Sequence, residues 1–237
     1  IVISSGLVSA NSFLTMAARY LFTTRGWKNK GIGKTVVCTT MIDKWAAGVE
    51  IPVFEVPVGF KYFSQLLFDG VIGIGGEESA GASFLKKDGT VWTTDKDGII
   101  MALLSMEIMA VMGKSALKMA DDFAENYGEP RFGRIDAPCK KEQKQILKQL
   151  SAELITATSV DGDPITGIRT TSMYNNMPID GVRVETDKGW FVARPSGTED
   201  LYKIYGESYK GDLGLVALLT AGEEIVNAAL NGKIDSE

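Results

Sequence analysis

The sequence contains no histidine, and this absence removes several kinds of chemistry at once. Without an imidazole there is no Ser-His or Cys-His nucleophile pair and no histidine-ligated zinc site. Any acid–base step that this chain performs must use Asp, Glu, Lys, Tyr or a group of the substrate itself. The search for functional residues therefore narrows to carboxylates, amines and hydroxyls.

Cysteine is scarce, and basic residues are not in excess. Cys38 and Cys139 stand far apart without a CxxC spacing, which predicts two free thiols in a reducing compartment such as the cytoplasm. The chain has 25 Lys and Arg against 30 Asp and Glu, a formal net charge of -5. A protein without a basic field does not attract nucleic acid, so we expect no nucleic-acid partner.

Long apolar runs are also missing. No stretch of about 18 consecutive apolar residues occurs, so we expect no membrane-spanning helix and no membrane partner. The opening segment, IVISSGLVSANSFL, has neither the basic start nor the long apolar core of a signal peptide. The chain begins with Ile1 rather than Met, which suggests a segment cut from a longer protein.

Helices and strands alternate in the first half of the chain. The hydrophobic fraction of 45% and the 26 glycines indicate a globular protein with a sizeable core and many tight turns. Periodicity predicts helices at 13–22, 41–47, 60–68 and 98–112 and strands at 35–38, 52–56 and 71–74. This alternation predicts a layered α/β domain over residues 1–127.

The second half begins with a polar, punctuated stretch that contains Pro130 and Pro138 and is rich in Lys and Gln. Such a composition is typical of a linker, which we place at residues 128–144. Beyond it, the pattern predicts strands at 182–184, 190–193 and 202–205 and a final amphipathic helix at about 215–230. Residues 145–237 are therefore predicted to form a smaller α+β domain.

Two glycine-rich segments resemble nucleotide-binding motifs but depart from them. Gly31–Thr35 looks like the end of a P-loop, yet position 28 holds Lys where a glycine is required, and a strand rather than a helix is predicted beside Lys34. Gly73–Glu78 begins like GxGxxG, but Glu78 occupies the position of the third glycine. Neither segment predicts a nucleotide site.

A third glycine-rich segment, Gly75–Gly81, follows a predicted strand and carries polar side chains. Its glycines allow close approach of a ligand, while Glu77 and Ser79 offer an acceptor and a donor suited to neighbouring sugar hydroxyls. The same residues are also typical of a tight turn with solvated acids. On local chemistry alone both interpretations stand.

Residues 93–98 lie at the predicted start of the long helix 98–112. Asp95 or Asp97 is a suitable helix cap, and Lys96 would stand beside the helix N-terminus, where anions are favoured. A solvated capping loop has the same composition. This segment is therefore a candidate anion site that the local pattern does not distinguish from a simple cap.

The most informative segment is Arg194–Glu199, between two predicted strands. Arg194 offers a rigid two-pronged donor for phosphate oxygens, and the hydroxyls of Ser196 and Thr198 can add to it. Backbone N–H groups around Gly197 can complete an anion nest. A simple hairpin turn does not require an arginine and two hydroxyls around one glycine, so we favour a phosphate-binding function here.

Together these segments resemble the α-D-phosphohexomutase superfamily, and most closely its bacterial phosphoglucomutases. The resemblance extends over nearly the whole chain. It rests on GKTVV, FEVPVGFKYF, GIGGEESAGASFLKKDGTVWTTDKDGIIMALLSMEI, GDPIT, GWFVARPSGTEDLYKIYGES and the closing helix. Family enzymes have four domains, and the resemblance implies that this chain corresponds to domains 3 and 4.

The resemblance also assigns roles to particular residues. Glu77 and Ser79 look like the readers of sugar hydroxyls, and Lys61 and Lys96 look like active-site lysines that contact substrate or assist proton transfer. The phosphate-holding loop of domain 4 looks like Arg194, Ser196, Gly197 and Thr198, with added positive charge from Lys203. The GEES form of the sugar loop is typical of glucose-selective members.

The family reaction interconverts glucose 1-phosphate and glucose 6-phosphate through glucose 1,6-bisphosphate and uses Mg2+. The family's phosphoserine and its Asp-x-Asp-x-Asp-Arg metal loop belong to domains 1 and 2, and neither is found in this sequence. The resemblance therefore implies that domains 1 and 2 are required as partners, on the same or a separate chain, and that this chain alone is inactive. Two alternatives stay open: a non-catalytic sugar-phosphate binding module, and a phosphohexomutase of another specificity such as a phosphomannomutase.

Overall fold

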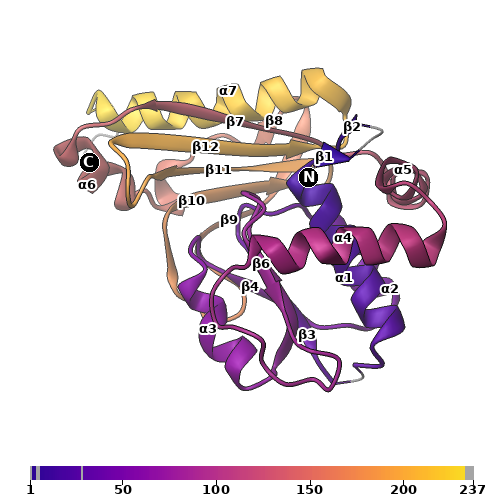
Figure 1. Cartoon of the computed structure of the whole chain (residues 1–237). Helices are drawn as coiled ribbons and strands as arrows, with labels where there is room; N and C mark the ends of the chain where they lie inside the picture. Colours follow the sequence, from indigo (N-terminus) through magenta and orange to yellow (C-terminus); the bar gives the residue numbers. More distant parts are fainter. Residues whose placement is uncertain (1, 4–5, 28, 233–237) are drawn as a thin grey trace. The chain divides into compact units, whose positions relative to one another are not determined.

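The computed structural model describes residues 2–3, 6–27 and 29–232, coloured along the chain in Figure 1. It divides into two compact units. The first unit contains Ile1–Gly128 and Met173–Asn175, and the second contains Glu129–Ser172 and Asn176–Glu237. Residue 1 and residues 233–237, at the outer ends of the two predicted domains, lie outside the described residues.

The first unit is built on a four-stranded sheet with the order β4-β3-β5-β6, in which β3 pairs in parallel with both β4 and β5. Its elements are β1 (Val2–Ile3), β2 (Gly6–Leu7), α1 (Ala10–Thr24), β3 (Gly31–Thr35), α2 (Met41–Gly48), β4 (Val53–Val56), α3 (Lys61–Phe68), β5 (Ile72–Gly76), β6 (Ala82–Phe84), α4 (Gly98–Met112) and α5 (Ala116–Tyr127). The predicted α/β class is confirmed, because helices and strands alternate from α1 to β5.

Close packing on the central strand explains its glycines. A Cβ added at Gly33 would lie 2.7 Å from Cδ1 of Ile72 and 2.9 Å from Cδ1 of Phe63. Phe63, on α3, is fully buried against this strand. The helix therefore lies directly on the sheet, at a distance that only a residue without a side chain allows.

The strand predicted at 35–38 was misplaced by four residues, because β3 spans Gly31–Thr35. After the strand the chain turns, and the amide of Cys38 donates to the carbonyl of Thr35. Val36 and Val37 are nevertheless fully buried. An apolar run that continues past the end of a buried strand misled the prediction.

Helix α5 was not predicted, although the sequence carries signals for its start. Gly113 ends α4 with a left-handed φ of 63°, the usual conformation of a glycine after a helix. Two residues later Ser115 caps α5, its side chain accepting from the amide of Lys118. Met119 and Phe123 then bury one side of the helix.

The second unit is a six-stranded antiparallel sheet with the order β7-β12-β11-β10-β9-β8, and α6 and α7 pack on it. Its elements are β7 (Arg131–Pro138), α6 (Lys141–Lys148), the 3-10 helix η1 (Ala152–Leu154), β8 (Ser159–Val160), β9 (Asp163–Thr171), β10 (Pro178–Thr186), β11 (Gly189–Pro195), β12 (Leu201–Ser208) and α7 (Gly211–Leu230). The predicted α+β class of this half is confirmed.

The prediction that residues 128–144 form a linker is wrong. This stretch contains β7, which pairs with β12 from Leu201↔Pro138 to Ser208↔Arg131, and the first turn of α6. This edge strand exposes alternate side chains, so its composition is polar. Polarity and prolines at its ends suggested a linker, while the long-range pairing partner was invisible in the local pattern.

Helix α7 covers the sheet of the second unit. Leu218 and Val226 join its core, and a Cβ added at Gly222 would lie 2.6 Å from Cγ2 of Ile204. Within the described residues, α7 alone and the bent pair α4–α5 are long and apolar enough to cross a membrane by length and composition. A helix that packs on a core sheet passes the same test, and α7 is such a helix.

Met173–Asn175, in the turn after β9, belong to the first unit. The amide of Tyr174 donates to the carbonyl of Glu55, and its ring meets Phe54 edge-on with centroids 4.6 Å apart. The amide of Met173 donates to the Glu55 carboxylate at 3.3 Å. Residues from distant parts of the sequence thus complete the outer strand of the first sheet.

Candidate functional site

A first candidate site lies where the parallel strands of the first unit end. Because β3, β4 and β5 are parallel, their carboxyl ends meet at one edge of the sheet, the usual ligand edge of such sheets. The turn after β5 is closed by a hydrogen bond from the Glu77 amide to the Gly81 carbonyl, at 2.8 Å. Ala80 has a φ of 74° at its tip. A non-glycine residue in this conformation marks a turn held by its surroundings.

Glu77 points into this edge rather than into solvent. Only 7% of the residue is exposed, and its carboxylate accepts a hydrogen bond from the backbone of Gly59, in the turn after β4. Burial raises the pKa of Glu77 above its ordinary value, and the nearby charge of Lys96 opposes the rise. The carboxylate is therefore desolvated but locally compensated.

Lys96 reaches Glu77 from the loop before α4. Its Nζ lies 3.6 Å from Oε2 of Glu77, and 5.9 Å from the ring centroid of Phe60. A Cβ at Gly81 would lie 2.8 Å from Cδ of Lys96 and 3.1 Å from Oε2 of Glu77, so glycine makes room for the pair. The structure thus brings together two predicted residues from separate motifs.

The other two predicted residues of this unit are more exposed. Ser79 lies exposed near the tip of the turn, and its side chain has no hydrogen-bond partner among the described residues. Lys61 begins α3, and its Nζ lies 5.0 Å from the ring centroid of Tyr62. No ion pair in the described part of the chain joins Lys61 to Glu77, so the structure does not bring this lysine into the Glu77–Lys96 pair.

A small pocket of 190 Å³ opens beside Glu77. Besides Glu77 it is lined by Phe13 and Leu14 of α1, by Met101 of α4 and by small residues. Sequence reasoning missed these contributions from α1, and it also missed the backbone of Gly59. These residues lie in segments without a polar motif. Only the fold places them beside the Glu77 carboxylate.

Lys34, in the segment that looks like a P-loop, does not serve an external phosphate. It lies within β3 with 2% of its side chain exposed and forms an ion pair with Asp43. Its Nζ also donates to the carbonyl of Thr39. The charge of this lysine is used inside the protein, in agreement with the sequence analysis.

A second candidate site, in the second unit, is the turn between β11 and β12. Ser196 closes the turn through hydrogen bonds from its amide to the Leu201 carbonyl, at 2.8 Å, and from the Glu199 amide to its Oγ, at 3.2 Å. Gly197 and Thr198 are exposed at the tip. A Cβ at Gly197 would meet nothing within 4 Å, so the chain itself does not require glycine here.

Arg194 is the unusual residue of this turn, because it is buried and the described residues provide no counter-ion for it. It is 8% exposed, and its Nε donates to the Ile179 carbonyl at 3.3 Å. No carboxylate in the described part of the chain forms an ion pair with it. Gly181 lets the strands close around it, since a Cβ there would lie 2.7 Å from Cβ of Arg194. A buried cation without a partner is costly, and an anionic ligand would remove that cost.

Lys203 is the cross-strand neighbour of Arg194 but is already paired. Its Nζ lies 2.5 Å from Oε2 of Glu199, and this ion pair lowers the pKa of the Glu199 carboxyl. Its positive charge is therefore compensated in the free chain. Of the two predicted cations near this turn, Arg194 is the one available to an anion.

The described residues contain no group of three or more Asp, Glu, His or Cys side chains that could hold a metal ion. The carboxylates nearest the two candidate sites, Glu77 and Glu199, are each paired with a lysine. These residues do not fit a magnesium site, and we assign no metal-dependent step to them.

The architecture defines the class of protein: domain III and the C-terminal domain of the phosphohexomutase fold. Residues 9–127 match the phosphoglucomutase/phosphomannomutase α/β/α domain III, and residues 135–214 match the C-terminal domain of the same family. The chain belongs to the phosphoglucomutase/phosphomannomutase family, which confirms the resemblance seen in its motifs.

Individual relatives agree with this assignment. A phosphoglucomutase of Komagataeibacter xylinus is 47% identical over 225 residues, which cover 94% of this chain and 40% of that relative. Two solved structures share the fold. One is a phosphoglucomutase/phosphomannomutase family protein of Burkholderia thailandensis, with a TM-score of 0.70 at 19% identity over 98% of this chain and 44% of that one. The other is pp63/parafusin, a phosphoglucomutase of Paramecium, with a TM-score of 0.68 at 20% identity over 100% and 44%.

Proposed function

We propose that this chain supplies sugar and phosphate recognition to a phosphoglucomutase, which interconverts glucose 1-phosphate and glucose 6-phosphate through glucose 1,6-bisphosphate. The 47% identity to a protein named phosphoglucomutase supports the reaction, and the GEES sequence of the turn at Glu77 supports glucose as the hexose. Because the chain spans 40% of that relative, recognition rather than the whole reaction is the part assigned to it.

The observation that carries the proposal is the buried, uncompensated guanidinium of Arg194. A structural arginine in such a position normally has a carboxylate partner. A phosphate oxygen pair would accept its two-pronged hydrogen bonds and supply the missing charge. The exposed hydroxyl of Thr198 and the open space over Gly197 leave room for that ligand.

In the first unit, Glu77 would accept hydrogen bonds from neighbouring hexose hydroxyls, with Ser79 as an added donor. Burial raises the pKa of Glu77, and the charge of Lys96 opposes that rise and so favours the ionised carboxylate, which is the stronger acceptor. We propose Lys61 and Lys96 as the amines that contact substrate or assist proton transfer. Lys203 would add charge to the phosphate turn only when Glu199 releases it.

Mg2+ and glucose 1,6-bisphosphate belong to the proposed reaction of the whole enzyme. The described residues offer no fit for the metal, so its ligands and the phosphoryl-carrying serine would come from domains 1 and 2 of the family, on the same or a separate chain. Both cysteines are free and buried, and burial raises the pKa of Cys38 to about 12. Inert thiols of this kind support a reducing, cytoplasmic setting.

Titration calorimetry on the purified chain tests the proposal. We expect glucose 1-phosphate to bind more tightly than glucose or inorganic phosphate alone, and more tightly than mannose 1-phosphate or glucosamine 1-phosphate. Arg194→Ala should abolish the preference for phosphorylated ligands. Equal affinity of wild type and Arg194→Ala for glucose 1-phosphate would remove the basis of the assignment.

A second candidate is a non-catalytic sugar-phosphate binding module, favoured by the lack of a metal-holding group in the described residues. An assay coupled to oxidation of glucose 6-phosphate separates the two. The mutase proposal expects no turnover by the chain alone and Mg2+-dependent turnover after addition of domains 1 and 2 of a family enzyme. Sugar-phosphate binding without such rescue would favour the module.

A further inference from the structure

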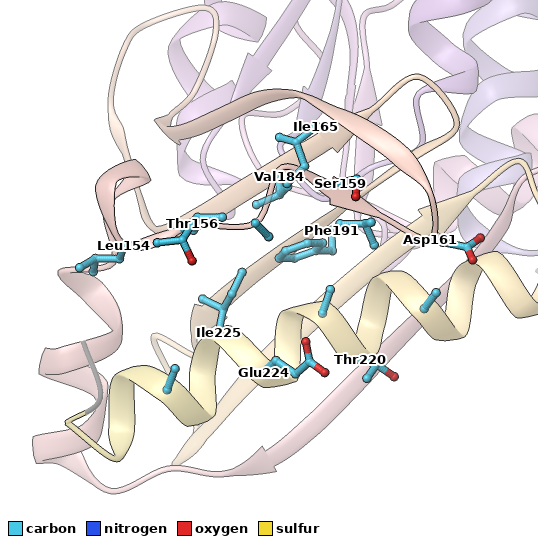
Figure 2. Close-up of a pocket in the computed structure, with 16 residues that line it drawn as sticks. Leu154, Thr156, Ser159, Asp161, Ile165, Val184, Phe191, Thr220, Glu224 and Ile225 are labelled. Atoms are coloured by element: carbon cyan, nitrogen blue, oxygen red, sulfur yellow. The ribbon is translucent and has the colours of Figure 1, made fainter. Parts of the chain in front are cut away.

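A second cavity, of 490 Å³, lies within the second unit between α7 and residues 154–161, as Figure 2 shows. Its floor is formed by the fully buried side chains of Val184 and Phe191. Side chains alternate along a strand, so Phe191 and Arg194, three residues apart on β11, point to opposite faces of the sheet. The cavity is therefore separate from the phosphate turn.

The cavity exists because α7 presents small side chains to it. Ala217, Ala221 and Ala228 line it from the helix, while Leu154 and Ile155 line it from the opposite segment. Its volume falls within the range of about 300 to 1,000 Å³ that is usual for small-molecule sites. Its walls are mainly apolar, so a ligand with an apolar body would gain by displacing water from them.

The charges around the cavity exclude an anionic ligand. No Lys or Arg lines it, whereas Asp161 and Glu224 do. Asp161 is compensated by Lys210, whose Nζ lies 2.7 Å from its Oδ2. Glu224 forms no ion pair within the described part of the chain, and Figure 2 shows its carboxylate at the edge of the cavity between Ile225 and Thr220. One negative charge beside an apolar hollow is thus left for a ligand to neutralise.

We propose that this cavity binds a small amphipathic cation, with its apolar body against Phe191, Val184 and Ile225 and its ammonium group beside Glu224. Hexose phosphates do not suit the site, because they are anionic and carry little apolar surface. The site would therefore bind a ligand different from the sugar phosphate, and it stands independently of the function proposed above.

The test uses n-octylammonium as probe and octanoate, of the same length and opposite charge, as its counterpart. We expect octylammonium to shift the amide NMR signals of residues 154–165 and 217–228 in a saturable manner, and octanoate to bind at least about fivefold more weakly. Equal binding of the two probes, or shifts outside these segments, would overturn the proposal.

Two glutamate variants provide a matched pair. Glu224→Gln should weaken octylammonium binding about threefold, the size expected for an exposed ion pair. Glu223→Gln should leave it unchanged, because the Glu223 charge faces Tyr202, whose pKa it raises, and does not line the cavity. If the two variants behaved alike, Glu224 would have no role.

A third variant, Ala221→Phe, fills the cavity from α7. It should abolish octylammonium binding while glucose 1-phosphate binding stays as in the wild type. Thermal melting followed by circular dichroism reports whether Ala221→Phe folds. If Ala221→Phe does not fold, Glu224→Gln still tests the proposal, because it changes an exposed helix position. Retained octylammonium binding by folded Ala221→Phe would contradict the proposal.

Discussion

The turn at Glu77 and the turn at Arg194 both place a buried charge at the end of a strand, but they compensate it differently. Glu77 has a cation, Lys96, within 3.6 Å and a backbone hydrogen bond from Gly59. Arg194 has a carbonyl of Ile179 and no carboxylate among the described residues. A compensated carboxylate suits neutral hydroxyls, whereas an uncompensated guanidinium suits an anion. This difference supports our proposal that hexose hydroxyls and phosphate bind at different turns.

The two turns also differ in what holds them. The Glu77 turn depends on tight packing, with Gly81 against Lys96 and Ala80 in a left-handed conformation. The Arg194 turn is held by the paired strands β11 and β12 and by the side chain of Ser196, while its tip at Gly197 stays open. Substitutions in the Glu77 turn should therefore lower the stability of the protein. Substitutions in the Arg194 turn should mainly weaken ligand binding.

The largest effect is expected from Arg194→Met. Loss of charge-assisted hydrogen bonds, worth about 1.5 to 3 kcal/mol, should weaken glucose 1-phosphate binding roughly tenfold to a hundredfold. The free energy of unfolding should not fall, because the substitution removes a buried charge that no carboxylate among the described residues compensates. Calorimetry and urea denaturation measure the two quantities.

Arg131→Met is the matched control for this variant. Arg131 is exposed and paired with Glu129 and Asp212, so its loss should leave the affinity unchanged. A strong loss of stability in Arg194→Met, with unchanged affinity, would show that Arg194 is structural and that the contrast between the turns is false.

Glu77→Gln should have an intermediate effect, about fivefold on hexose phosphate affinity, because a neutral amide accepts more weakly than a carboxylate. It should also change the pH dependence of stability. Burial raises the pKa of Glu77 in the folded chain, so the folded state holds this proton more tightly than the unfolded state. Wild-type stability should then fall as pH rises from the ordinary value of 4.5 through the raised pKa, and Glu77→Gln should lack that fall. Urea denaturation across this range would contradict us if both proteins showed the same slope.

Lys96→Ala tests the comparison between the two turns. It removes the positive charge beside Glu77, so that this buried carboxylate, like the buried guanidinium of Arg194, has no counter-ion among the described residues. Because Lys96 lowers the pKa of Glu77, its removal should raise that pKa further, and carbon-detected NMR titration of the carboxylate measures the change. We expect only about a twofold loss of affinity at neutral pH, since Lys96 is half-exposed. Lys87→Ala, at an exposed position, is the control and should leave the pKa of Glu77 unchanged.

The smallest effect on stability is expected from Gly197→Ala. A Cβ there meets nothing within 4 Å, so the free energy of unfolding should change by less than about 0.5 kcal/mol. Affinity for glucose 1-phosphate should nevertheless fall, because the methyl group occupies space over the turn. Gly181→Ala provides the opposite case, since its Cβ would lie 2.2 Å from the Ala193 carbonyl oxygen and must destabilise the sheet. Equal destabilisation by Gly197→Ala and Gly181→Ala would show that the tip of the Arg194 turn is not open space.

Much of the fold could be read from local patterns. Helix α4 was predicted from its apolar spacing with its observed bounds, Gly98–Met112, and the structure shows that Asp97 caps it and Gly113 ends it. The three polar turns were located from their composition alone. The pairing of β7 with β12 could not be predicted, because a polar edge strand looks like a linker until its partner is known.

The sequence by itself determined which residues can act: a histidine-free chain with one glutamate turn and one arginine turn, each between elements of clear periodicity. The tertiary structure decided the state of those residues. It buried Glu77 beside Lys96, paired Lys203 with Glu199, and opened a cavity under α7. Among the residues that the structure describes, it placed no carboxylate beside Arg194. Periodicity and capping act between residues close in the chain, whereas desolvation and charge pairing depend on neighbours that only folding brings together.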